Sequence, residues 1–374
     1  MSKHFDTIAT HGAGSASYEG SVSFPIFQTA TYSGSEGYSY TRCANPTREE
    51  LQRTVALLEG GAQGFAFASG LAAVCSVFSL LSAGDHVLIS DDLYGGTYRA
   101  VKEIFERLGI AFTFADLQEP ADAEKHLRPN TKLLFVETPT NPTMKVIPMR
   151  TLAQLAKAHG SYLAVDNTFL TPYFQRPFDH GADIVLHSGT KFLAGHHETG
   201  CGIAVVKEGA LAERLALLQR TLGNALSPFD SWLTLRGLQT LPVRMEKHQK
   251  NALAAASFLE HHPRVERVLY PGLPSHPAFE INKAQATGAG GVLSFVLKDH
   301  AVEGILRGGA LIRFAESLGG TTSLITYPKT QTHASVPEDV RNRMGITSRL
   351  LRLSVGLEHE EDLLKDLEEL LSRR

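Results

Sequence analysis

Seven short apolar runs recur along the first two-thirds of the chain, and helical patterns separate most of them. Amphipathic patterns at 95–108 and 151–158 are typical of such connecting helices. Strands that alternate with helices predict an α/β fold with a mainly parallel sheet that helices cover on both faces. The expected strands lie at 64–67, 86–89, 111–114, 133–136, 162–165, 183–186 and 202–206.

Residues 1–46 differ in character from this alternating region. They hold many Ser, Gly, Thr and Tyr residues without a clear helical period, which predicts an extended arm instead of a core element. The first core helix is expected to begin at about Thr47, because Thr47 and Glu50 have the spacing of a capping box. Gly60-Gly61 is expected to end it.

A smaller segment follows a long helical stretch over about 230–260. A single hydrophobic core stops growing at about 250–300 residues, so a chain of 374 residues is expected to divide. We expect an arm at 1–46, a large domain at 47–245 and a C-terminal domain at 246–374. The elements expected in the last part are a strand at 291–297, a helix ending near Leu318, a strand near 351–355 and a charged C-terminal helix.

Composition excludes several classes of function. The net charge of -3, without a Lys/Arg cluster beside an amphipathic stretch, argues against a nucleic-acid partner and against membrane binding. The most apolar stretch, 71–81, is too short to span a bilayer, and the N-terminus lacks an apolar signal-peptide core. Cys43, Cys75 and Cys201 are too few for a disulfide framework. We therefore expect a cytoplasmic protein.

The segment Ser188-Gly189-Thr190-Lys191 directly follows an expected strand. A lysine in that place is ordinarily a solvated loop cation. Here two hydroxyl groups precede it, spaced to hold a phosphate while the amine of Lys191 condenses with an aldehyde on the same molecule. This combination predicts pyridoxal phosphate as the cofactor.

Two further features lie at strand ends, where ligands bind in open α/β sheets. Asp166, in VDNTF, is either a turn cap or a carboxylate that pairs with the protonated ring nitrogen of pyridoxal phosphate. Ala68-Ser69-Gly70-Leu71 lies between a strand and a helix, where small residues let backbone N–H groups approach an anion. The second signal is weak alone, because many strand–helix turns contain Ser-Gly.

Tyr94 and Arg352 complete the set of candidate residues. Tyr94, in DLYGGTYR, is either a packing residue or an aromatic ring that stacks on the cofactor, with its hydroxyl available for proton transfer. Arg352 stands between leucines in LLRLSVGLE, an unusual place for an arginine without a partner. Its planar guanidinium is suited to bidentate binding of an amino-acid carboxylate.

Six motifs together resemble those of the trans-sulfuration enzymes. That family includes cystathionine γ-synthases, cystathionine β- and γ-lyases and related sulfhydrylases. The resemblance covers nearly the whole chain. Its motifs are ETPTNP at 137–142, VDNTF at 165–169, HSGTKFLAGH at 187–196, SLGG at 317–320, THASVP, which begins at Thr332, and RLSVGLE at 352–358.

The resemblance implies a pyridoxal-phosphate enzyme of fold type I and a role for each matching residue. Lys191 would form the Schiff base with the cofactor and later act as the base. Asp166 would pair with the pyridine nitrogen, and Tyr94 would stack on the ring. The remaining implied contacts are those of the phosphate with Gly70, Leu71, Ser188 and Thr190, and those of the substrate carboxylate with Asn141, Ser317 and Arg352.

The resemblance also implies an assembly. Tyr40 and Arg42 form the motif Tyr-x-Arg ahead of Asn45-Pro46-Thr47, in an arm that crosses to a neighbouring subunit in this family. Both would reach the phosphate of that subunit. We therefore expect an obligate dimer with shared active sites, within a tetramer built as a dimer of dimers.

The implied reaction is cleavage or formation of the carbon–sulfur bond of a cystathionine-type amino acid, by a cystathionine β- or γ-lyase or a γ-synthase. The choice between β- and γ-chemistry stays open. The alternatives are an O-acylhomoserine sulfhydrylase, an aminotransferase or decarboxylase, and a non-catalytic protein that binds pyridoxal phosphate.

Departures from the family pattern bear on this choice. Thr321-Thr322 follow SLGG, where the family has one variable residue and then Glu, so the substrate stays open. Gly96 stands where methionine γ-lyases have a Cys, which argues against that activity.

No metal site is expected near His196-His197-Glu198, because adjacent histidines rarely ligate one ion with good geometry. The stretch 197–202, HETGCG, itself departs from the family pattern of an acidic or amide residue followed by small apolar residues. His333 is expected to form structural hydrogen bonds and not to act as a base.

Overall fold

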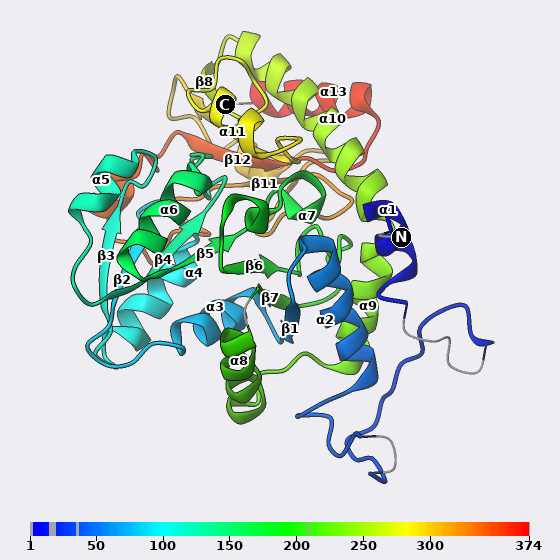
Figure 1. The fold of residues 1–374 in the computed structure, drawn as a ribbon. Helices are drawn as coiled ribbons and strands as arrows, with labels where there is room; N and C mark the ends of the chain where they lie inside the picture. The colour runs from blue at the N-terminus through cyan, green and yellow to red at the C-terminus, as the bar shows by residue number, and fades with distance from the viewer. Residues whose placement is uncertain (1–2, 15–19, 35–36, 208, 374) are drawn as a thin grey trace.

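The computed structural model describes residues 3–14, 20–34, 37–207 and 209–373 (Figure 1). Its large sheet has the strand order β1-β7-β6-β5-β4-β2-β3. All these strands are parallel except β7, which runs antiparallel to β1 and β6, so the predicted α/β fold is confirmed. The strands are β1 (Gln63–Phe67), β2 (His86–Ser90), β3 (Ala111–Ala115), β4 (Thr131–Glu137), β5 (Tyr162–Asp166), β6 (Ile184–Ser188) and β7 (Gly202–Val206).

Helices cover both faces of the large sheet. One face packs against α1 (Phe5–His11), α2 (Pro46–Glu59), α5 (Pro120–Lys125) and α6 (Met149–His159). The other packs against α3 (Gly70–Phe78), α4 (Gly95–Ala100) with the π-helical turn Val101–Phe105, and α8 (Gly209–Leu222). Both faces are therefore buried, as continuous apolar strands require.

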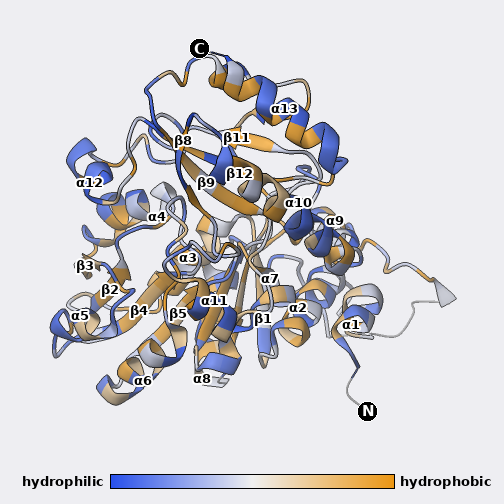
Figure 2. Cartoon of the chain, turned by 90° about the horizontal axis from the view of Figure 1, so that it is seen from above, coloured by the Kyte–Doolittle hydropathy of each residue, from blue (hydrophilic) through white to orange (hydrophobic). Residues whose placement is uncertain are grey.

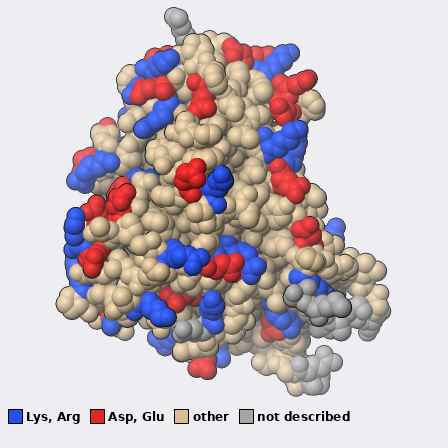
Figure 3. Space-filling model, turned by 45° about the horizontal axis from the view of Figure 1, so that its top comes forward, with Lys and Arg blue, Asp and Glu red and all other residues tan. Residues whose placement is uncertain are grey.

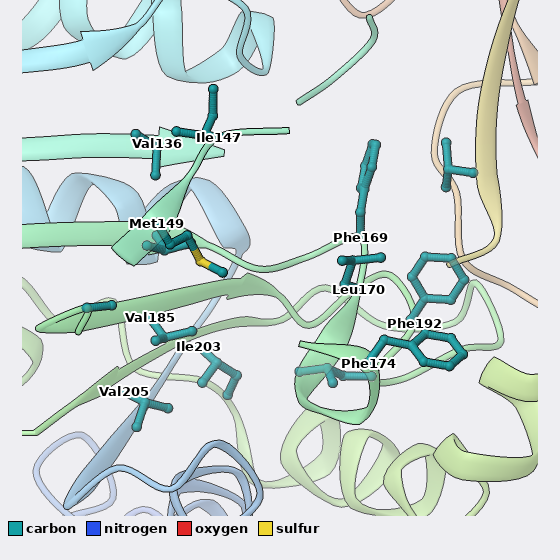
Figure 4. Packing of buried hydrophobic residues seen from close by; sticks show 14 of the residues in the cluster. Val136, Ile147, Met149, Phe169, Leu170, Phe174, Val185, Phe192, Ile203 and Val205 are labelled. Carbon is teal, nitrogen blue, oxygen red and sulfur yellow. The ribbon is translucent and has the colours of Figure 1, made fainter. Parts of the chain in front are cut away.

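The central strands divide their side chains between two hydrophobic clusters. In β4, Leu134 and Val136 belong to one cluster and Leu133 and Phe135 to the other. This follows from the alternation of side chains along a strand. Figure 4 shows Val136 with other members of the first cluster, and in Figure 2 the strands are mostly orange while the outer helix α13 (Glu360–Ser372) alternates between orange and blue.

A second sheet lies beside the first, with the order β10-β11-β12-β9-β8. Its strands are β8 (Val265–Leu269), β9 (Val292–Leu297), β10 (Arg313–Phe314), β11 (Leu324–Thr326) and β12 (Leu350–Ser354). The remaining helices are α7 (Thr171–Phe174), α9 (Pro228–Leu238), α10 (Leu241–His261), α11 (Phe279–Gln285) and α12 (Glu338–Arg343), with 3-10 turns at Pro177–His180 and Ile305–Arg307. The expected strands at 291–297 and 351–355 and the C-terminal helix are confirmed. The domain boundaries stay a prediction.

The capping prediction for the first core helix is wrong by two residues. Asn45 is the N-cap of α2, and its side chain accepts hydrogen bonds from the backbone N–H groups of Thr47 and Arg48. Thr47 Oγ1 instead donates to Pro25 O at 3.0 Å, and Glu50 Oε1 accepts from Ala13 N at 2.8 Å, so both side chains attach the preceding segment. The expected end of the helix at Gly60 is confirmed, with a φ of 77°.

The helical stretch expected over about 230–260 is confirmed and consists of two helices, because α9 ends at Leu238 and Pro242 lies in the first turn of α10. Two other expectations about helices are wrong. Residues 5–11 of the expected extended arm form α1, in which Ala9 is buried. No helix ends near Leu318, where Ser317 and Gly319 have φ values of 89° and 79°.

None of the described helices is long and apolar enough to cross a membrane. On the face in Figure 3, Lys and Arg side chains are interspersed with Asp and Glu, so this face carries no field of a single sign.

Candidate active site

The carboxyl ends of β4, β5 and β6 open onto a cavity of about 260 Å³. Parallel strands end at the same edge of a sheet, which is where ligands bind in open α/β folds. All predicted site residues except Tyr40 and Arg42 line this cavity: Gly70, Leu71, Tyr94, Asn141, Asp166, Ser188, Thr190, Lys191, Ser317 and Arg352.

Lys191 lies in the turn after β6, and its Nζ donates a hydrogen bond to Ser317 Oγ at 2.7 Å. Burial, with the nearby positive charge of Arg352, lowers the pKa of Lys191 to about 8. A cation is costly to keep in a poorly solvated site. The amine is therefore partly neutral near physiological pH, which is the form that attacks an aldehyde.

The first turn of helix α3 forms one end of the cavity. Ser69 is the N-cap, and its hydroxyl accepts from the backbone N–H of Ala72 at 3.1 Å. The N–H groups of Gly70 and Leu71 precede the first intrahelical bonds and are directed outward from the helix N-terminus. A Cβ on Gly70 would lie 2.8 Å from Ser188 Cβ, so the close approach of this turn to Ser188 requires glycine.

Thr190 lies at the same end, where its hydroxyl has other partners. It donates to Cys201 O at 3.2 Å and accepts from Cys201 N at 2.9 Å. The hydroxyl therefore ties the lysine turn to the start of β7, in addition to facing the cavity.

Asp166 is the last residue of β5. Its Oδ1 accepts from the backbone N–H of Thr168 at 3.0 Å and from the Thr168 hydroxyl at 2.5 Å. The same hydroxyl oxygen accepts from Ser188 N at 2.8 Å, which joins Asp166 to the lysine turn. Burial raises the pKa of Asp166, and these hydrogen bonds oppose that effect.

Tyr94 lies at the start of α4 and is 42% exposed. Its backbone N–H donates to Glu137 Oε1 at 2.9 Å. A Cβ on Gly96 would lie 2.2 Å from Tyr94 Cε1, so any side chain at position 96 would displace the ring. This contact gives a physical reason for the glycine that the sequence places here.

Arg352 is central to β12 and only 1% exposed. It donates to Asn141 Oδ1 at 3.0 Å, to Ser317 O at 2.8 Å and to Thr326 Oγ1 at 3.0 Å. Its Nε is buried without a hydrogen-bond partner among the described residues. Burial lowers the pKa of Arg352 to about 10. All its hydrogen-bond partners are neutral, and the negative charge that acts on it is that of Glu316 in the cavity wall. An anionic ligand would therefore add a counter-charge in direct contact with the guanidinium.

Tyr40 and Arg42 lie away from this cavity within the single chain. Arg42 Nη1 donates to Arg220 O at 2.5 Å, and its Cζ lies 5.7 Å from the centroid of the Tyr40 ring. Both residues line a separate shallow cavity. Their predicted role at a phosphate stays a prediction.

Sequence reasoning missed several residues that line the cavity: Thr97, Glu137, Thr168, Glu316 and Thr332. Glu137 was visible as the first residue of ETPTNP, but its neighbour Asp166 lies elsewhere in the sequence. His333 has the expected structural contacts: Nε2 donates to Leu93 O at 2.9 Å, and Nδ1 lies 2.9 Å from Thr332 Oγ1. Burial lowers the pKa of His333 to about 4, which keeps the ring neutral.

His196 and Glu198, considered above for a metal, lie 3.9 Å apart and are partly exposed. Among the residues that the structure describes, no group of three or more His, Cys, Asp or Glu side chains is arranged to hold a metal ion.

Comparisons with known proteins identify the family of this chain. The profile described as "Cys/Met metabolism PLP-dependent enzyme" matches residues 6–372. The chain belongs to this family. Pyridoxal phosphate is therefore its cofactor, and the expectations of that cofactor and of trans-sulfuration chemistry are confirmed.

Members of the Cys/Met metabolism family that carry different enzyme names have nearly the same sequence identity to this chain. Cystathionine beta-lyase MetC of Bacillus subtilis is 48% identical over 94% of this chain and 92% of that protein. Cystathionine gamma-synthase of Haemophilus influenzae is 47% identical over 96% of this chain and 95% of that protein. The crystal structure of cystathionine gamma-lyase from Lactobacillus plantarum, complexed with L-serine, has a TM-score of 0.97 and 41% identity, with 99% of each chain covered.

The residues of the cavity fit the cofactor of this family. A turn that only glycine allows adjoins two hydroxyls at one end, and the carboxyl group of Asp166 lines the same cavity as the depressed-pKa amine of Lys191. An anion-binding helix terminus, a carboxylate and a reactive amine are the three groups that pyridoxal phosphate needs.

Proposed function

We propose that this enzyme breaks or forms the carbon–sulfur bond of a cystathionine-type amino acid. One observation carries the proposal: Lys191, Asp166 and Arg352 line one cavity in a member of the Cys/Met metabolism family. An amine, an acid and a buried guanidinium supply an attachment point, a partner for a cationic ring and a site for a substrate carboxylate.

Four groups would hold the phosphate of the cofactor: the N–H groups of Gly70 and Leu71 and the hydroxyls of Ser188 and Thr190. Asp166 would hold the ring nitrogen in its protonated form, and the Tyr94 ring would stack on the cofactor. The Lys191 amine would bind the aldehyde carbon covalently. When bound, pyridoxal phosphate supplies an electron sink for the α-carbon of an amino acid.

Arg352 would orient the substrate through its carboxylate, with Asn141 and Ser317 beside it. Lys191, once released from the cofactor, would take the proton from the α-carbon of the substrate with its Nζ. A sulfur leaving group on the β-carbon could then depart directly. A leaving group on the γ-carbon requires a second proton transfer at the β-carbon, which the same Nζ would perform.

The attachment site has a direct test. Reduction of the holoenzyme with borohydride, followed by peptide mapping, is expected to place the reduced pyridoxyl group on Lys191. Lys191→Ala is expected to lower turnover by about 10²–10⁴-fold or more, because the only base in this scheme is lost. A pyridoxyl group on another lysine would refute the assignment.

The choice among reactions needs a product assay. Cystathionine, cysteine, methionine and O-acylated homoserines would be supplied separately, with and without cysteine as the second substrate. Release of pyruvate or 2-oxobutyrate with a thiol, without a keto-acid acceptor, identifies a lyase. Cystathionine formed from an O-acylhomoserine identifies a γ-synthase. Turnover only with a keto-acid acceptor identifies an aminotransferase and refutes the proposal.

We also propose that the enzyme works in the cytoplasm as a dimer, within a dimer of dimers, in which Tyr40 and Arg42 complete the phosphate site of a neighbouring subunit. Their distance from the cavity of their own chain supports this proposal. The test mixes Arg42→Ala subunits with Lys191→Ala subunits. One site of each hybrid dimer then has both intact residues, so activity should return; inactive hybrids would contradict the shared site.

A further inference from the structure

Glu137 is the last residue of β4 and lies directly beside Asp166, the last residue of β5. The two are register partners in neighbouring parallel strands. Side chains of register partners project from the same face, and neighbouring strands are about 4.8 Å apart. Both residues accordingly line the same cavity. The cavity therefore contains a pair of adjacent carboxyl groups.

Glu137 is nearly enclosed and has defined hydrogen-bond partners. It is 6% exposed, and its Oε1 accepts from the backbone N–H of Tyr94 at 2.9 Å. A backbone hydrogen bond from Asn141 also reaches this carboxyl group. The side chain thus joins the end of β4 to the segment that carries Tyr94 and to the loop that carries Asn141.

Within the described residues, the only favourable charge near the pair is a small effect of His187, which lowers the pKa of Asp166. Neither carboxyl group forms an ion pair with a Lys, Arg or His side chain of the described residues. The two cations of the cavity have other contacts, Lys191 with Ser317 and Arg352 with three neutral groups. Asp92, at the end of β2, adds a further acid near Glu137.

Two adjacent carboxylates in an enclosed site repel each other strongly, so the pair retains a proton. Each carboxyl group accepts two hydrogen bonds, so nearby charges decide between them: His187 lowers the pKa of Asp166, whereas Asp92 raises the pKa of Glu137. Burial, and then the charge of Asp166, raise the pKa of Glu137 well above its usual range. The proton therefore resides on Glu137.

We propose that Glu137 is a positioning residue that works as a neutral carboxylic acid, holding the backbone of Tyr94 while the only negative charge of the pair stays on Asp166. The proposal rests on the proposed role of Asp166 opposite the cofactor ring. A second carboxylate beside the cofactor ring would compete with Asp166 for the proton on the ring nitrogen. A neutral acid avoids this and still offers Oε1 to Tyr94.

The proposal makes glutamine the matched substitute, because Glu137→Gln keeps the shape and the acceptor oxygen without a charge. Glu137→Gln holoenzyme is expected to keep the cofactor dissociation constant and kcat/KM within about threefold of the wild type. Glu137→Ala leaves the Tyr94 N–H without its acceptor and is expected to lower kcat/KM about tenfold or more. Rescue by glutamine separates a neutral positioning group from a charged one.

A spectroscopic measurement tests the protonation state without relying on activity. In holoenzyme labelled with ¹³C-glutamate, the infrared C=O stretch of a protonated carboxylic acid is expected at neutral pH and should be missing in Glu137→Gln. No such difference, or a cofactor affinity lowered tenfold or more by Glu137→Gln, would overturn the proposal. An Ala variant as active as the wild type would also overturn it, because Glu137 would then position nothing.

A separate measurement tests the proposed role of Asp166, on which the role of Glu137 rests. Asp166→Asn holoenzyme with unchanged cofactor absorption would refute the role of Asp166. The infrared band of Glu137 would still report the protonation state of its own group.

Discussion

Two buried acid clusters lie at the same edge of the large sheet, on its opposite faces. On one face, Glu137 and Asp166 border the cavity without a cationic partner. On the other, Glu59 of α2 accepts from His187 Nε2 at 2.6 Å and from Asn167 at 3.0 Å, and both side chains of the Glu59–His187 pair are fully buried. In the second cluster, side chains of the protein supply hydrogen-bond donors to the carboxyl group, whereas the first cluster has no cationic side chain paired with its acids.

The difference indicates which cluster serves a ligand. Buried charges are tolerated when they are paired and hydrogen-bonded, and protein groups meet this condition at Glu59 Oε1, although Glu59 Oε2 and His187 Nδ1 have no hydrogen-bond partner among the described residues. The Asp166 cluster meets it only when a cation enters the cavity, and the protonated ring of pyridoxal phosphate is such a cation. Substitutions in the two clusters should therefore affect different properties of the enzyme.

The largest effect is expected from His187→Phe, and it concerns stability. The substitution keeps a ring but leaves Glu59 with a single remaining donor, at a cost of about 3–5 kcal/mol for a broken buried pair. The midpoint of thermal unfolding measures it. His248→Phe is the matched control, since His248 is equally buried and its Nδ1 contacts only Val355 O, so about 0.5–1.5 kcal/mol is expected. Equal losses of stability in the two variants would show that the Glu59–His187 pair contributes no more than a single hydrogen bond.

The sequence predicted part of the cluster of Glu137 and Asp166, which borders the cavity, and none of the cluster of Glu59 and His187. Asp166 and Lys191 follow apolar strands directly, so position alone placed them at one edge of the sheet. The pairing of Glu137 with Asp166 depends on strand register, which local pattern does not specify. Glu59 and His187 are 128 residues apart, and only the packing of α2 against the large sheet brings them together.

Local errors have equally specific causes. Asn45 and Thr47 are both good capping residues, and Pro46 decides between them, because proline is favoured at the first helical position. Near Leu318 no helix forms, because the preceding segment Arg313–Phe314 is instead strand β10, which pairs in parallel with β11. Ser317, which has a positive φ, hydrogen-bonds with Lys191 and Arg352, and both partners are distant in sequence.

Asp166→Ala tests the cluster of Glu137 and Asp166, and it should affect catalysis while leaving the fold intact. Loss of the group that stabilises the cationic ring is expected to lower kcat/KM by about 10²–10³-fold. The stability of the cofactor-free protein should change little, because the loss of two hydrogen bonds from Thr168 is offset by the removal of a buried acid that has no ion-pair partner. Steady-state kinetics and unfolding of the apoprotein measure the two properties. A destabilised apoprotein with normal kinetics would show that Asp166 serves stability and not catalysis.

Arg352→Ala tests the other side of the cavity. Loss of charged hydrogen bonds to the substrate carboxylate costs about 1.5–3 kcal/mol, which raises KM about 10- to 150-fold. The dissociation constant of pyridoxal phosphate should change much less. Arg352→Lys keeps the charge without the planar fork and is expected to recover only part of the loss. An unchanged KM in the Ala variant would remove Arg352 from the substrate site.

The smallest expected effect concerns the pH at which the apoenzyme takes up its cofactor. Lys191 reacts only as the neutral amine, and its pKa is lowered to about 8, first by burial and then by Arg352. The neutral fraction is then about one-tenth at pH 7 and nine-tenths at pH 9, whereas a lysine of ordinary pKa would be almost entirely charged over this range. The rate of covalent cofactor attachment should rise about tenfold between these pH values and then level off.

Arg352→Ala sharpens this last measurement. The positive charge of Arg352 opposes protonation of Lys191, so its removal should move the midpoint of the rate profile to higher pH, by less than about one unit because burial is the larger cause. Lys191→Ala provides the baseline without attachment. A midpoint near the ordinary lysine value in the wild type, or a shift to lower pH in the Arg352 variant, would show that the cavity does not hold the amine as the structure indicates.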